Sequence, residues 1–249
     1  MRIPRIYIPE DILLNTEFTL PDDAATHVGR VLRMKPETKL TLFNGQGGEY
    51  KAHICDVQRH KVTAIADNFV DRNCESPLTI TLVQCISRGE RMDYTIQKAV
   101  ELGVTNIQPV FSQRSTVKLD EKRLARKTEH WQKTVISACE QSGRNYVPIV
   151  NPAINYSDII DQYNDKDQLK LIMHTVEDAD DPFTLSQLDS DLSHCVLLAG
   201  PEGGLTDDEV KLAEQHKFRV IQLGPRILRT ETAALAMISV LQSHAGDMK

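Results

Sequence analysis

The chain has 249 residues, a formal net charge of −6 and a hydrophobic content of 41%, enough for one large domain or two smaller domains. No apolar run approaches the roughly 18 residues of a membrane-spanning helix, and no signal peptide is recognisable, so we expect a cytoplasmic protein without a membrane partner. The five cysteines are widely spaced and the eight histidines show no ligand spacing, which argues against a disulfide framework and a metal site; Cys85 and Cys195 lie in apolar runs and are expected to pack in the core.

Residues 1–72 are predicted to be mostly β. Residues 3–8 form a short strand that Pro4 interrupts, which suits the edge of a sheet. Three further strands are expected, over residues 39–43, 49–57 and 61–70. The Gly-rich turn 44–48 lacks a following helix, Lys or Ser/Thr, and this favours a plain hairpin over a phosphate-binding loop.

A short helix is predicted from Pro21, because proline and two acidic residues suit a first helical turn. Its continuation carries Arg30 and Arg33 three positions apart, hence on one face. A compact β unit with an arginine pair on its helix suggests an RNA-binding barrel. A purely structural cap is the alternative reading of the same residues.

The polar, breaker-rich segment 71–77 predicts a domain boundary, which divides the chain into residues 1–72 and 73–249. Beyond it strands and helices alternate, and this order is typical of an α/β domain with a mostly parallel sheet. Strands are expected over residues 78–86, 106–111, 169–173, 195–199 and 220–223, and helices over residues 91–102, 119–142 and 206–216. The rest of the acidic segment 151–191 is expected to be irregular.

The positive charge lies mainly in the first 150 positions, which hold 21 of the 29 lysines and arginines. Ten acidic residues fall between positions 158 and 191. Because local patches determine the affinity for phosphate, the negative net charge does not exclude a nucleic-acid partner. The basic start of the helix 119–142 is expected to be a solvated face, with RNA contact as the alternative.

A loop near the end of the chain, residues 224–229, carries two arginines around an apolar pair. It joins a strand to an apolar helix, 233–241, which Thr230 or Thr232 is expected to cap. Loops between a strand end and a helix start are where open α/β proteins bind ligands. The alternative is an ordinary turn with surface arginines.

Three strand-end loops, at residues 173–176, 199–204 and 224–229, are expected to converge on one crevice if their strands are parallel and adjacent. Neither glycine-containing loop fits a phosphate-binding fingerprint. Glycines that allow close backbone approach, beside apolar side chains, suit a flat apolar ring with polar edges, such as adenine.

Two motifs, Gly-Pro-Glu-Gly-Gly-Leu-Thr at residues 200–206 and Leu-Gly-Pro-Arg-Ile-Leu-Arg-Thr-Glu-Thr-Ala at residues 223–233, resemble the RsmE family of SPOUT-class methyltransferases. Further matches lie at residues 30–33, 87–90, 97–104 and 140–144, so the resemblance covers the whole chain, with the acidic stretch 158–191 matching only loosely.

This resemblance implies an N-terminal PUA-like β-barrel and a C-terminal α/β domain with a deep trefoil knot, which neither spacing nor periodicity could show. It implies methyl transfer from S-adenosylmethionine to N3 of a uridine in small-subunit ribosomal RNA, within the assembled subunit, by a homodimer. The apolar helix 233–241 suits part of a dimer interface, although burial inside one subunit explains it equally.

Site residues follow from the motifs and the resemblance together. Arg229 is the candidate to stabilise negative charge on the uracil oxygens, with Arg226 in support, and Glu231 is a candidate proton acceptor. An ion pair with either arginine is the alternative role of Glu231. The expected cofactor-binding residues are His174, Leu198, Gly200, Gly203, Leu223, Gly224, Ile227, Leu228, Thr232 and Ala233. The expected RNA contacts are Arg30, Arg33, Arg88, Arg114 and Arg144.

Two rival functions remain at this point. One is a non-catalytic ribosome-binding or RNA-binding module that uses the same fold as a scaffold, and it need not bind the cofactor. The other is a nucleotide-dependent α/β enzyme acting on a small metabolite. The missing phosphate-loop motifs and the basic character of the first 150 residues count against the second rival.

Overall fold

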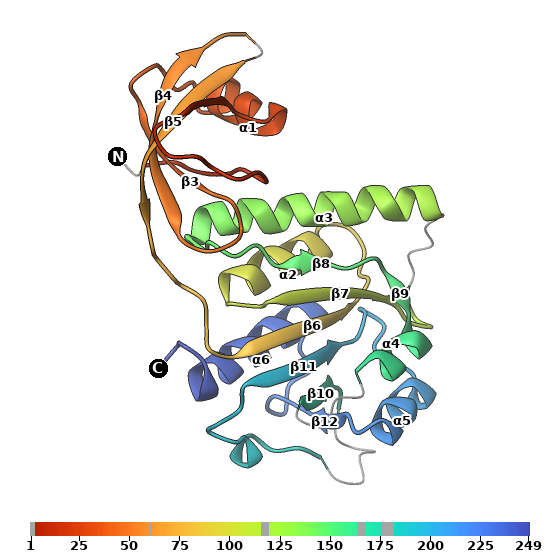
Figure 1. Cartoon of the computed structure of the whole chain (residues 1–249). Helices are drawn as coiled ribbons and strands as arrows, with labels where there is room; N and C mark the ends of the chain where they lie inside the picture. The colour runs from red at the N-terminus through yellow and green to blue at the C-terminus, as the bar shows by residue number, and fades with distance from the viewer. Residues whose placement is uncertain (1–2, 60, 116–119, 164–167, 176–181) are drawn as a thin grey trace. The chain divides into compact units, whose positions relative to one another are not determined.

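The computed structural model describes residues 3–59, 61–115, 120–163, 168–175 and 182–249 (Figure 1). The chain divides into two compact units, which are described separately. The first comprises Met1–Glu75 and Cys139–Val147, and the second comprises Ser76–Ala138 and Pro148–Lys249. The first unit therefore also contains Cys139–Val147, which begins more than sixty residues after Glu75 in the sequence.

The first unit is built on a five-stranded sheet of order β1-β3-β4-β5-β2. Its strands are β1 (Arg5–Tyr7), β2 (Glu17–Thr19), β3 (Lys39–Phe43), β4 (Glu49–Val57) and β5 (Val62–Val70). β1 lies at the edge, as predicted, and pairs in parallel with β3. β3 and β4 pair antiparallel, which confirms the plain hairpin at residues 44–48. The three-residue strand β2 was not predicted, because it is too short for a hydrophobic alternation to stand out.

The helix of this unit is shorter than predicted. α1 (Asp22–Thr26) passes into a π-helical turn, His27–Val31. In that turn the Leu32 N–H donates to the His27 carbonyl oxygen at 2.9 Å, an i to i+5 bond. Arg33 follows the turn with a φ of 50°. The prediction that Arg30 and Arg33 share one helix face is therefore wrong, because the chain has left the helix before Arg33, although both side chains are exposed.

A network of buried charges lies in the first unit. Glu49 is 4% exposed and forms ion pairs with Arg5 and Lys51. Arg144 is 5% exposed, and its Nε donates to Oε2 of Glu75 at 3.0 Å, with a second nitrogen on the same carboxylate. Arg144 was predicted to contact RNA. Its burial and its ion pair instead indicate a structural role, because the guanidinium charge is already used within the unit.

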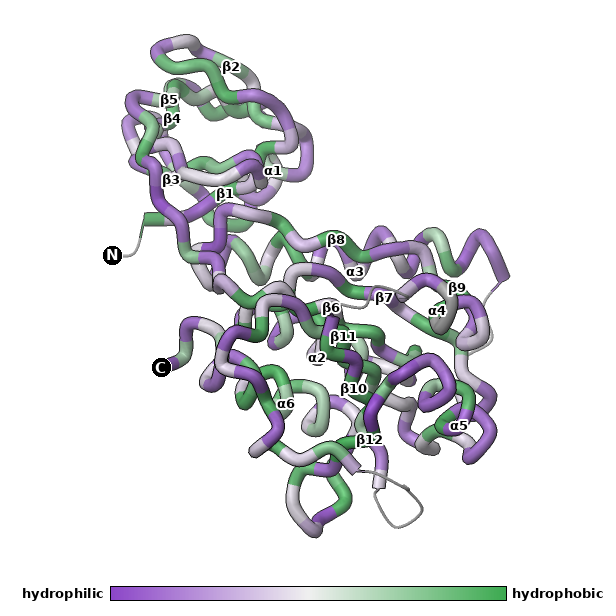
Figure 2. Tube along the Cα trace, turned by 60° about the horizontal axis from the view of Figure 1, so that its bottom comes forward, coloured by the Kyte–Doolittle hydropathy of each residue, from purple (hydrophilic) through white to green (hydrophobic). Residues whose placement is uncertain are grey.

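The second unit contains a sheet of order β12-β10-β11-β6-β7-β8, in which every pairing is parallel, with β9 also pairing with β7. This confirms the predicted parallel α/β domain. The strands are β6 (Thr79–Cys85), β7 (Asn106–Phe111), β8 (Ile149–Val150), β9 (Ile154–Asn155), β10 (Leu169–Met173), β11 (His194–Ala199) and β12 (Arg219–Ile221). In Figure 2 the central strands β6, β10 and β11 are largely hydrophobic in colour, as expected for strands buried on both faces.

The helices of this unit are α2 (Glu90–Glu101), α3 (Glu121–Ser142, whose last turn belongs to the first unit), α4 (Tyr156–Gln162), α5 (Asp207–Gln215) and α6 (Thr230–Ala245). A short 3-10 turn spans Leu185–Gln187. The predicted start of the long helix, Leu119, lies outside the described residues. The prediction that residues 151–191 are irregular outside the strand 169–173 is wrong at α4. In that helix Tyr156 and Ile159, three positions apart, are buried in the core.

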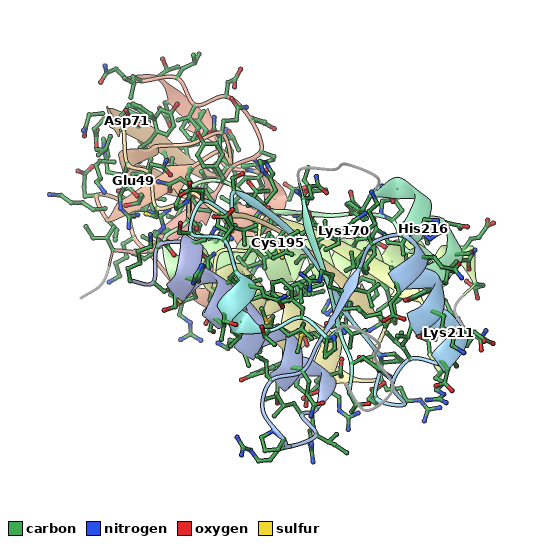
Figure 3. The ribbon with its side chains drawn as sticks, turned by 90° about the horizontal axis from the view of Figure 1, so that it is seen from below. Glu49, Asp71, Lys170, Cys195, Lys211 and His216 are labelled. Carbon is green, nitrogen blue, oxygen red and sulfur yellow. The ribbon has the colours of Figure 1, made fainter. Side chains whose placement is uncertain are left out.

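α4 and α5 pack on one face of the sheet, where they share a core cluster with Val83, Val196 and Leu198. α2 and α6 pack against each other, and α6 also contacts β11. Cys85 and Cys195 are buried, as predicted. Lys170 is 5% exposed, and its Nζ donates a hydrogen bond to the His216 carbonyl oxygen at 2.7 Å (Figure 3). None of the described helices is both long and apolar enough to cross a membrane.

Candidate functional site

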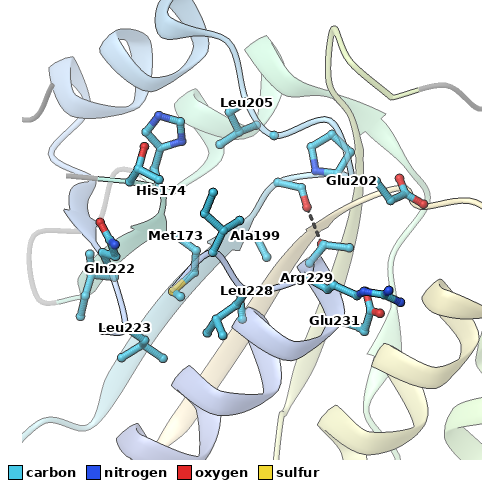
Figure 4. A pocket seen from close by; sticks show the side chains of 18 of the residues that line it. Met173, His174, Ala199, Glu202, Leu205, Gln222, Leu223, Leu228, Arg229 and Glu231 are labelled. Atoms are coloured by element: carbon cyan, nitrogen blue, oxygen red, sulfur yellow. Dashed lines mark hydrogen bonds between the residues drawn. The ribbon is translucent and has the colours of Figure 1, made fainter. Parts of the chain in front are cut away.

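A cavity of about 430 Å³ opens in the second unit at the carboxyl ends of β10, β11 and β12 (Figure 4). Its walls come from the loops after these three strands, at residues 173–175, 199–205 and 221–229, together with the start of α6. The predicted convergence of the three loops on one crevice is confirmed. Val176, included in the first predicted loop, lies outside the described residues.

Many of the predicted residues line this cavity. Those expected to hold the cofactor are His174, Gly200, Leu223, Ile227, Leu228 and Ala233, and the two candidate catalytic residues Arg229 and Glu231 lie beside them. Ile227 is unusual because its apolar side chain is 91% exposed. An apolar side chain this exposed at a cavity mouth is available for contact with a ligand.

Four predicted cofactor residues do not line the cavity. Leu198 is fully buried in the cluster beneath α4 and α5, because side chains alternate along a strand and its neighbour Ala199 faces the cavity instead. Thr232 is exposed outside the cavity. The backbone of Gly224 turns with a φ of 67°, and Gly203 packs against Arg114.

Other lining residues were not predicted as ligands. The strand ends contribute Met173, Thr175, Ala199, Ile221 and Gln222, the glycine loop contributes Pro201, Glu202, Gly204 and Leu205, and the remaining additions are Arg91, Arg226 and Thr230. Alternation along each strand could have shown that Ala199 rather than Leu198 faces the loops. Arg91 comes from the first turn of α2, a distant element that no local pattern connects to this site.

The start of α6 is tied to the glycine loop. The Thr230 hydroxyl donates to the Gly200 carbonyl oxygen at 2.5 Å and accepts a bond from Nε2 of Gln84 at 3.1 Å. The N-cap residue is Arg229, and its side chain makes no capping bond. The prediction that Thr230 or Thr232 caps this helix is therefore wrong, because Thr230 is already the first helical residue and its hydroxyl bonds to the Gly200 carbonyl oxygen.

The glycine loop is tightly folded. A Cβ atom on Gly200 would lie 3.1 Å from Cγ of Leu205, closer than ordinary packing allows, and Gly204 has a φ of 71°. Nη1 of Arg114 donates to the carbonyl oxygens of Gly203 and Leu205, both at 3.1 Å. Gly200 thus lets the loop fold closely on Leu205, and Arg114 fixes the loop. The close approach of a ligand to these glycines, expected from the sequence, stays a prediction.

Two carboxylates, those of Glu202 and Glu231, line the cavity. Glu202 pairs with Arg91 at 3.0 Å and accepts a bond from the Arg88 backbone N–H at 2.8 Å. Burial raises the pKa of Glu202, but hydrogen bonds from its own N–H, the Arg88 N–H and Arg91 outweigh burial and hold that pKa below its ordinary value.

Glu231 differs, since its Oε2 is buried and has no hydrogen-bond partner. Within the described part of the chain, no ion pair joins Glu231 to Arg226 or Arg229, so the alternative role considered for it is not observed. A buried carboxylate oxygen without a partner is costly, and such groups occur where a ligand completes them.

The cavity thus combines an apolar wall, backbone polar groups of a glycine loop and an unpartnered carboxylate. This combination suits a ligand with a flat apolar ring and a positive charge. Nothing in it resembles a metal centre, since no cluster of three or more potential ligands gathers among the residues that the structure covers.

The fold is that of an RNA methyltransferase. A family model described as RNA methyltransferase domain matches residues 74–242, and one described as RNA methyltransferase PUA domain matches residues 20–67. Ribosomal RNA small subunit methyltransferase E of Buchnera aphidicola subsp. Acyrthosiphon pisum is 36% identical over 248 residues, which cover 100% of this chain and 96% of that protein. The chain belongs to the ribosomal RNA small subunit methyltransferase E family, and the resemblance inferred from its motifs is confirmed.

Solved structures agree with this assignment. Ribosomal RNA small subunit methyltransferase E from Neisseria gonorrhoeae, bound to S-adenosyl methionine, has a TM-score of 0.93 and 43% identity, with 100% of both chains covered. A methyltransferase from Legionella pneumophila, in complex with the cofactor SAM, has a TM-score of 0.94 and 39% identity, covering 99% of this chain and 100% of that one.

Proposed function

We propose that this protein transfers a methyl group from S-adenosylmethionine to N3 of a uridine in small-subunit (16S) ribosomal RNA. Membership of the family and the cofactor bound in the two solved relatives support the cofactor and the RNA class. The N3 position of uridine rests on the resemblance of residues 200–206 and 223–233 to the RsmE motifs.

The observation that carries the proposal is the buried, unpartnered Oε2 of Glu231 at the cavity for the cofactor. S-adenosylmethionine has an adenine ring, which suits the apolar side chains of Leu223 and Leu228, and ribose and amino-acid groups that can bond to the backbone near Gly200. Its sulfonium supplies a methyl group that needs no further activation. The residues present therefore fit this cofactor.

The protein must favour the uridine anion, because N3 carries a proton at neutral pH and is a poor nucleophile until that proton leaves. We assign to Glu231 the role of accepting the N3 proton. To Arg229, exposed at the cavity mouth, we assign the role of stabilising the negative charge that then develops on the uracil oxygens, and the position of both residues in the cavity lining supports these roles. The cavity walls hold both reactants in register, which by itself removes a large part of the barrier.

The barrel, residues 1–72, is proposed to contact the RNA. A groove of about 610 Å³ in the first unit is lined by Arg30, Arg59 and Lys61, with Asp22 as its acidic member. Three basic side chains around one groove suit a phosphate backbone, and Arg59 and Lys61 add to the contact expected from Arg30. Arg33 is exposed outside this groove and stays a candidate, whereas the buried Arg144 is left out.

Three further properties implied by the family belong to the proposal. The first is a homodimer that uses α6, since Leu235, Ala236 and Val240 stay partly exposed beside its buried positions. The second is the deep trefoil knot, which rests on the resemblance of residues 200–206 and 223–233 to the RsmE motifs. The third is action in the cytoplasm on the assembled small subunit, where this RNA is found.

Mass mapping of modified nucleosides in ribosomal RNA from a strain that lacks the gene tests the reaction. Loss of one N3-methyluridine, restored by the wild-type gene, is the expected result, and an unchanged profile would refute it. Calorimetry with S-adenosylmethionine separates the enzyme from a non-catalytic RNA-binding module, because only the enzyme must bind the cofactor. Light scattering of a Val240→Glu variant, expected to be monomeric, tests the dimer.

A further inference from the structure

A second hollow of about 540 Å³ lies in the same unit as the cofactor cavity and shares two of its residues, Arg91 and Glu202. Its other members are Arg88, Gly89, Glu90, Arg114 and Gly203. The two hollows therefore have a common wall, formed by one arginine from the first turn of α2 and one glutamate from the glycine loop.

The charged side chains of this hollow differ in how many hydrogen bonds and ion pairs they already make. Glu202 already accepts bonds from Arg91 at 3.0 Å and from the Arg88 backbone N–H at 2.8 Å. Arg114 uses one nitrogen to hold the glycine loop. The Arg88 side chain makes no hydrogen bond or ion pair within the described part of the chain, and it is exposed. Three guanidinium groups face two carboxylates, and the excess charge is positive.

We infer that this hollow is the subsite for a phosphodiester group of the RNA strand that carries the target uridine, with Arg88 and Arg91 as its contacts. The inference rests on the proposed function and adds Arg91, which no motif pointed to. A base can enter the cofactor cavity only if its strand passes the cavity mouth, and Arg91 lies in the wall that separates the two hollows. A guanidinium fork matches the geometry of a phosphate group.

The shared wall also connects RNA binding to the glycine loop. The Arg91 side chain is 44% exposed, and its ion pair with Glu202 uses Nη1. A phosphate can accept bonds from the other guanidinium nitrogens of Arg91, while Glu202 keeps its bonds from Arg91 and the Arg88 N–H and with them the position of the loop. The strand thus docks against the same loop that forms the cofactor cavity.

The test measures binding of the full-length protein to small ribosomal subunits at several salt concentrations, together with methyl transfer and cofactor affinity. The variants are Arg88→Met, Arg91→Met and Arg91→Lys, with Lys211→Met as the matched control. Lys211 is an exposed residue of α5 that lines neither hollow (Figure 3). Thermal unfolding of each variant is recorded in parallel.

Each methionine variant is expected to weaken subunit binding roughly 10-fold and to reduce the salt slope by about 1. Arg88 does not line the cofactor cavity, so Arg88→Met should change cofactor affinity less than about 3-fold. Arg91→Lys should keep the salt slope, and Lys211→Met should change nothing. Wild-type binding and salt slope in Arg88→Met and Arg91→Met would overturn the inference, and so would an equal loss in Lys211→Met. If Arg91→Met does not fold, Arg88→Met decides alone.

These outcomes separate the subsite from the proposed reaction. Subunit binding and its salt slope are measured without methyl transfer, so they report on the hollow even if the modified base proves to be different. Failure of the wild-type protein to form N3-methyluridine refutes the reaction. Unaltered binding by the two methionine variants of a protein that does form it refutes only the subsite.

Discussion

The Thr230 hydroxyl donates to the Gly200 carbonyl oxygen at 2.5 Å, and this bond joins the first residue of α6 to the loop after β11. Gln84, 1% exposed on β6, donates to the same hydroxyl at 3.1 Å. Three segments that are remote in sequence are thus held together at one oxygen atom. The cavity walls depend on this junction, because both Gly200 and Thr230 line the cavity.

Replacing Thr230 with valine should weaken cofactor binding. Valine keeps the shape of the side chain but removes the bond to Gly200 and leaves the Gln84 amide short of an acceptor, at a cost of about 1–3 kcal/mol. We expect S-adenosylmethionine affinity, measured by calorimetry, to fall roughly 10-fold, and Thr230→Ser to restore it. Thr232→Val is the matched control. An equal loss in the control would show that the sequence-based assignment of Thr232 was right and the structural one wrong.

Removing the Glu231 carboxylate should affect the chemical step more than cofactor binding. Glu231→Gln keeps the size of the side chain but cannot accept the uridine proton. A loss of one positioned acid–base group typically costs about 10²–10⁴ in rate. Single-turnover methyl transfer measures this loss, and calorimetry checks that the cofactor still binds. Near-normal turnover would exclude Glu231 as the proton acceptor.

Arg229 and Arg226 provide a matched pair, since both are exposed arginines that line the same cavity. Arg229→Ala should reduce the methyl-transfer rate by roughly 10²–10³ with cofactor affinity intact, because one preorganised charge contact to the uracil oxygens is lost. Arg226→Ala should have a much smaller effect. The reverse order in single-turnover assays would exchange the roles of the two arginines.

The contrast between Arg144 and Arg33 tests the structural role inferred from burial. Arg144→Met leaves the Glu75 carboxylate without its ion pair, and breaking a buried pair costs about 3–5 kcal/mol. Arg33→Met changes an exposed residue and should alter stability by about 0.5 kcal/mol or less. Chemical denaturation compares the two variants. A stable Arg144→Met variant that binds RNA poorly would instead support the phosphate contact predicted from sequence.

The sequence predicted the elements and the site loops because their signals are local. Apolar runs such as those of β6 and β11 show buried strands, and the Thr206 capping box shows the start of α5 in both sequence and structure. The three strand-end loops converge because parallel strands bring their carboxyl ends to one edge. The cavity was thus accessible to prediction before any contact was known.

The features that escaped prediction depend on contacts between remote segments. Cys139–Val147 joins the first unit through the Arg144–Glu75 ion pair and the backbone bond from Gly47 to Asn145, which no periodicity encodes. Arg91 reaches the cavity from α2, and Thr230 leaves its capping role because the Gly200 carbonyl lies beside it. Likewise α4 is anchored in the core by Tyr156 and Ile159, among the side chains that the structure describes, and their contacts with strands of the sheet are remote in sequence.

Glu49 should make stability depend on pH. Burial alone would raise its pKa, but hydrogen bonds from Lys51 and Arg5 outweigh burial, and the pKa in the folded protein lies below the ordinary value of 4.5. A carboxyl group with a lowered pKa stabilises the folded state above its unfolded pKa, and this contribution is lost as the pH falls through the folded pKa. Stability should therefore decline below about pH 4.5 in part because Glu49 takes up a proton.

The variant Glu49→Gln isolates this contribution. At neutral pH it removes the charge partner of Arg5 and Lys51 and should destabilise the protein by about 3–5 kcal/mol. As the pH falls from about 4.5 through the lower pKa of the folded protein, the difference from wild type should shrink, because the unfolded state takes up the proton first and the folded state takes it up at still lower pH. Glu10→Gln, an exposed carboxylate with no ion pair in the described chain, should show no such convergence. Thermal unfolding from pH 3 to pH 8 measures both, and a difference for Glu49→Gln that is constant with pH would contradict the assignment.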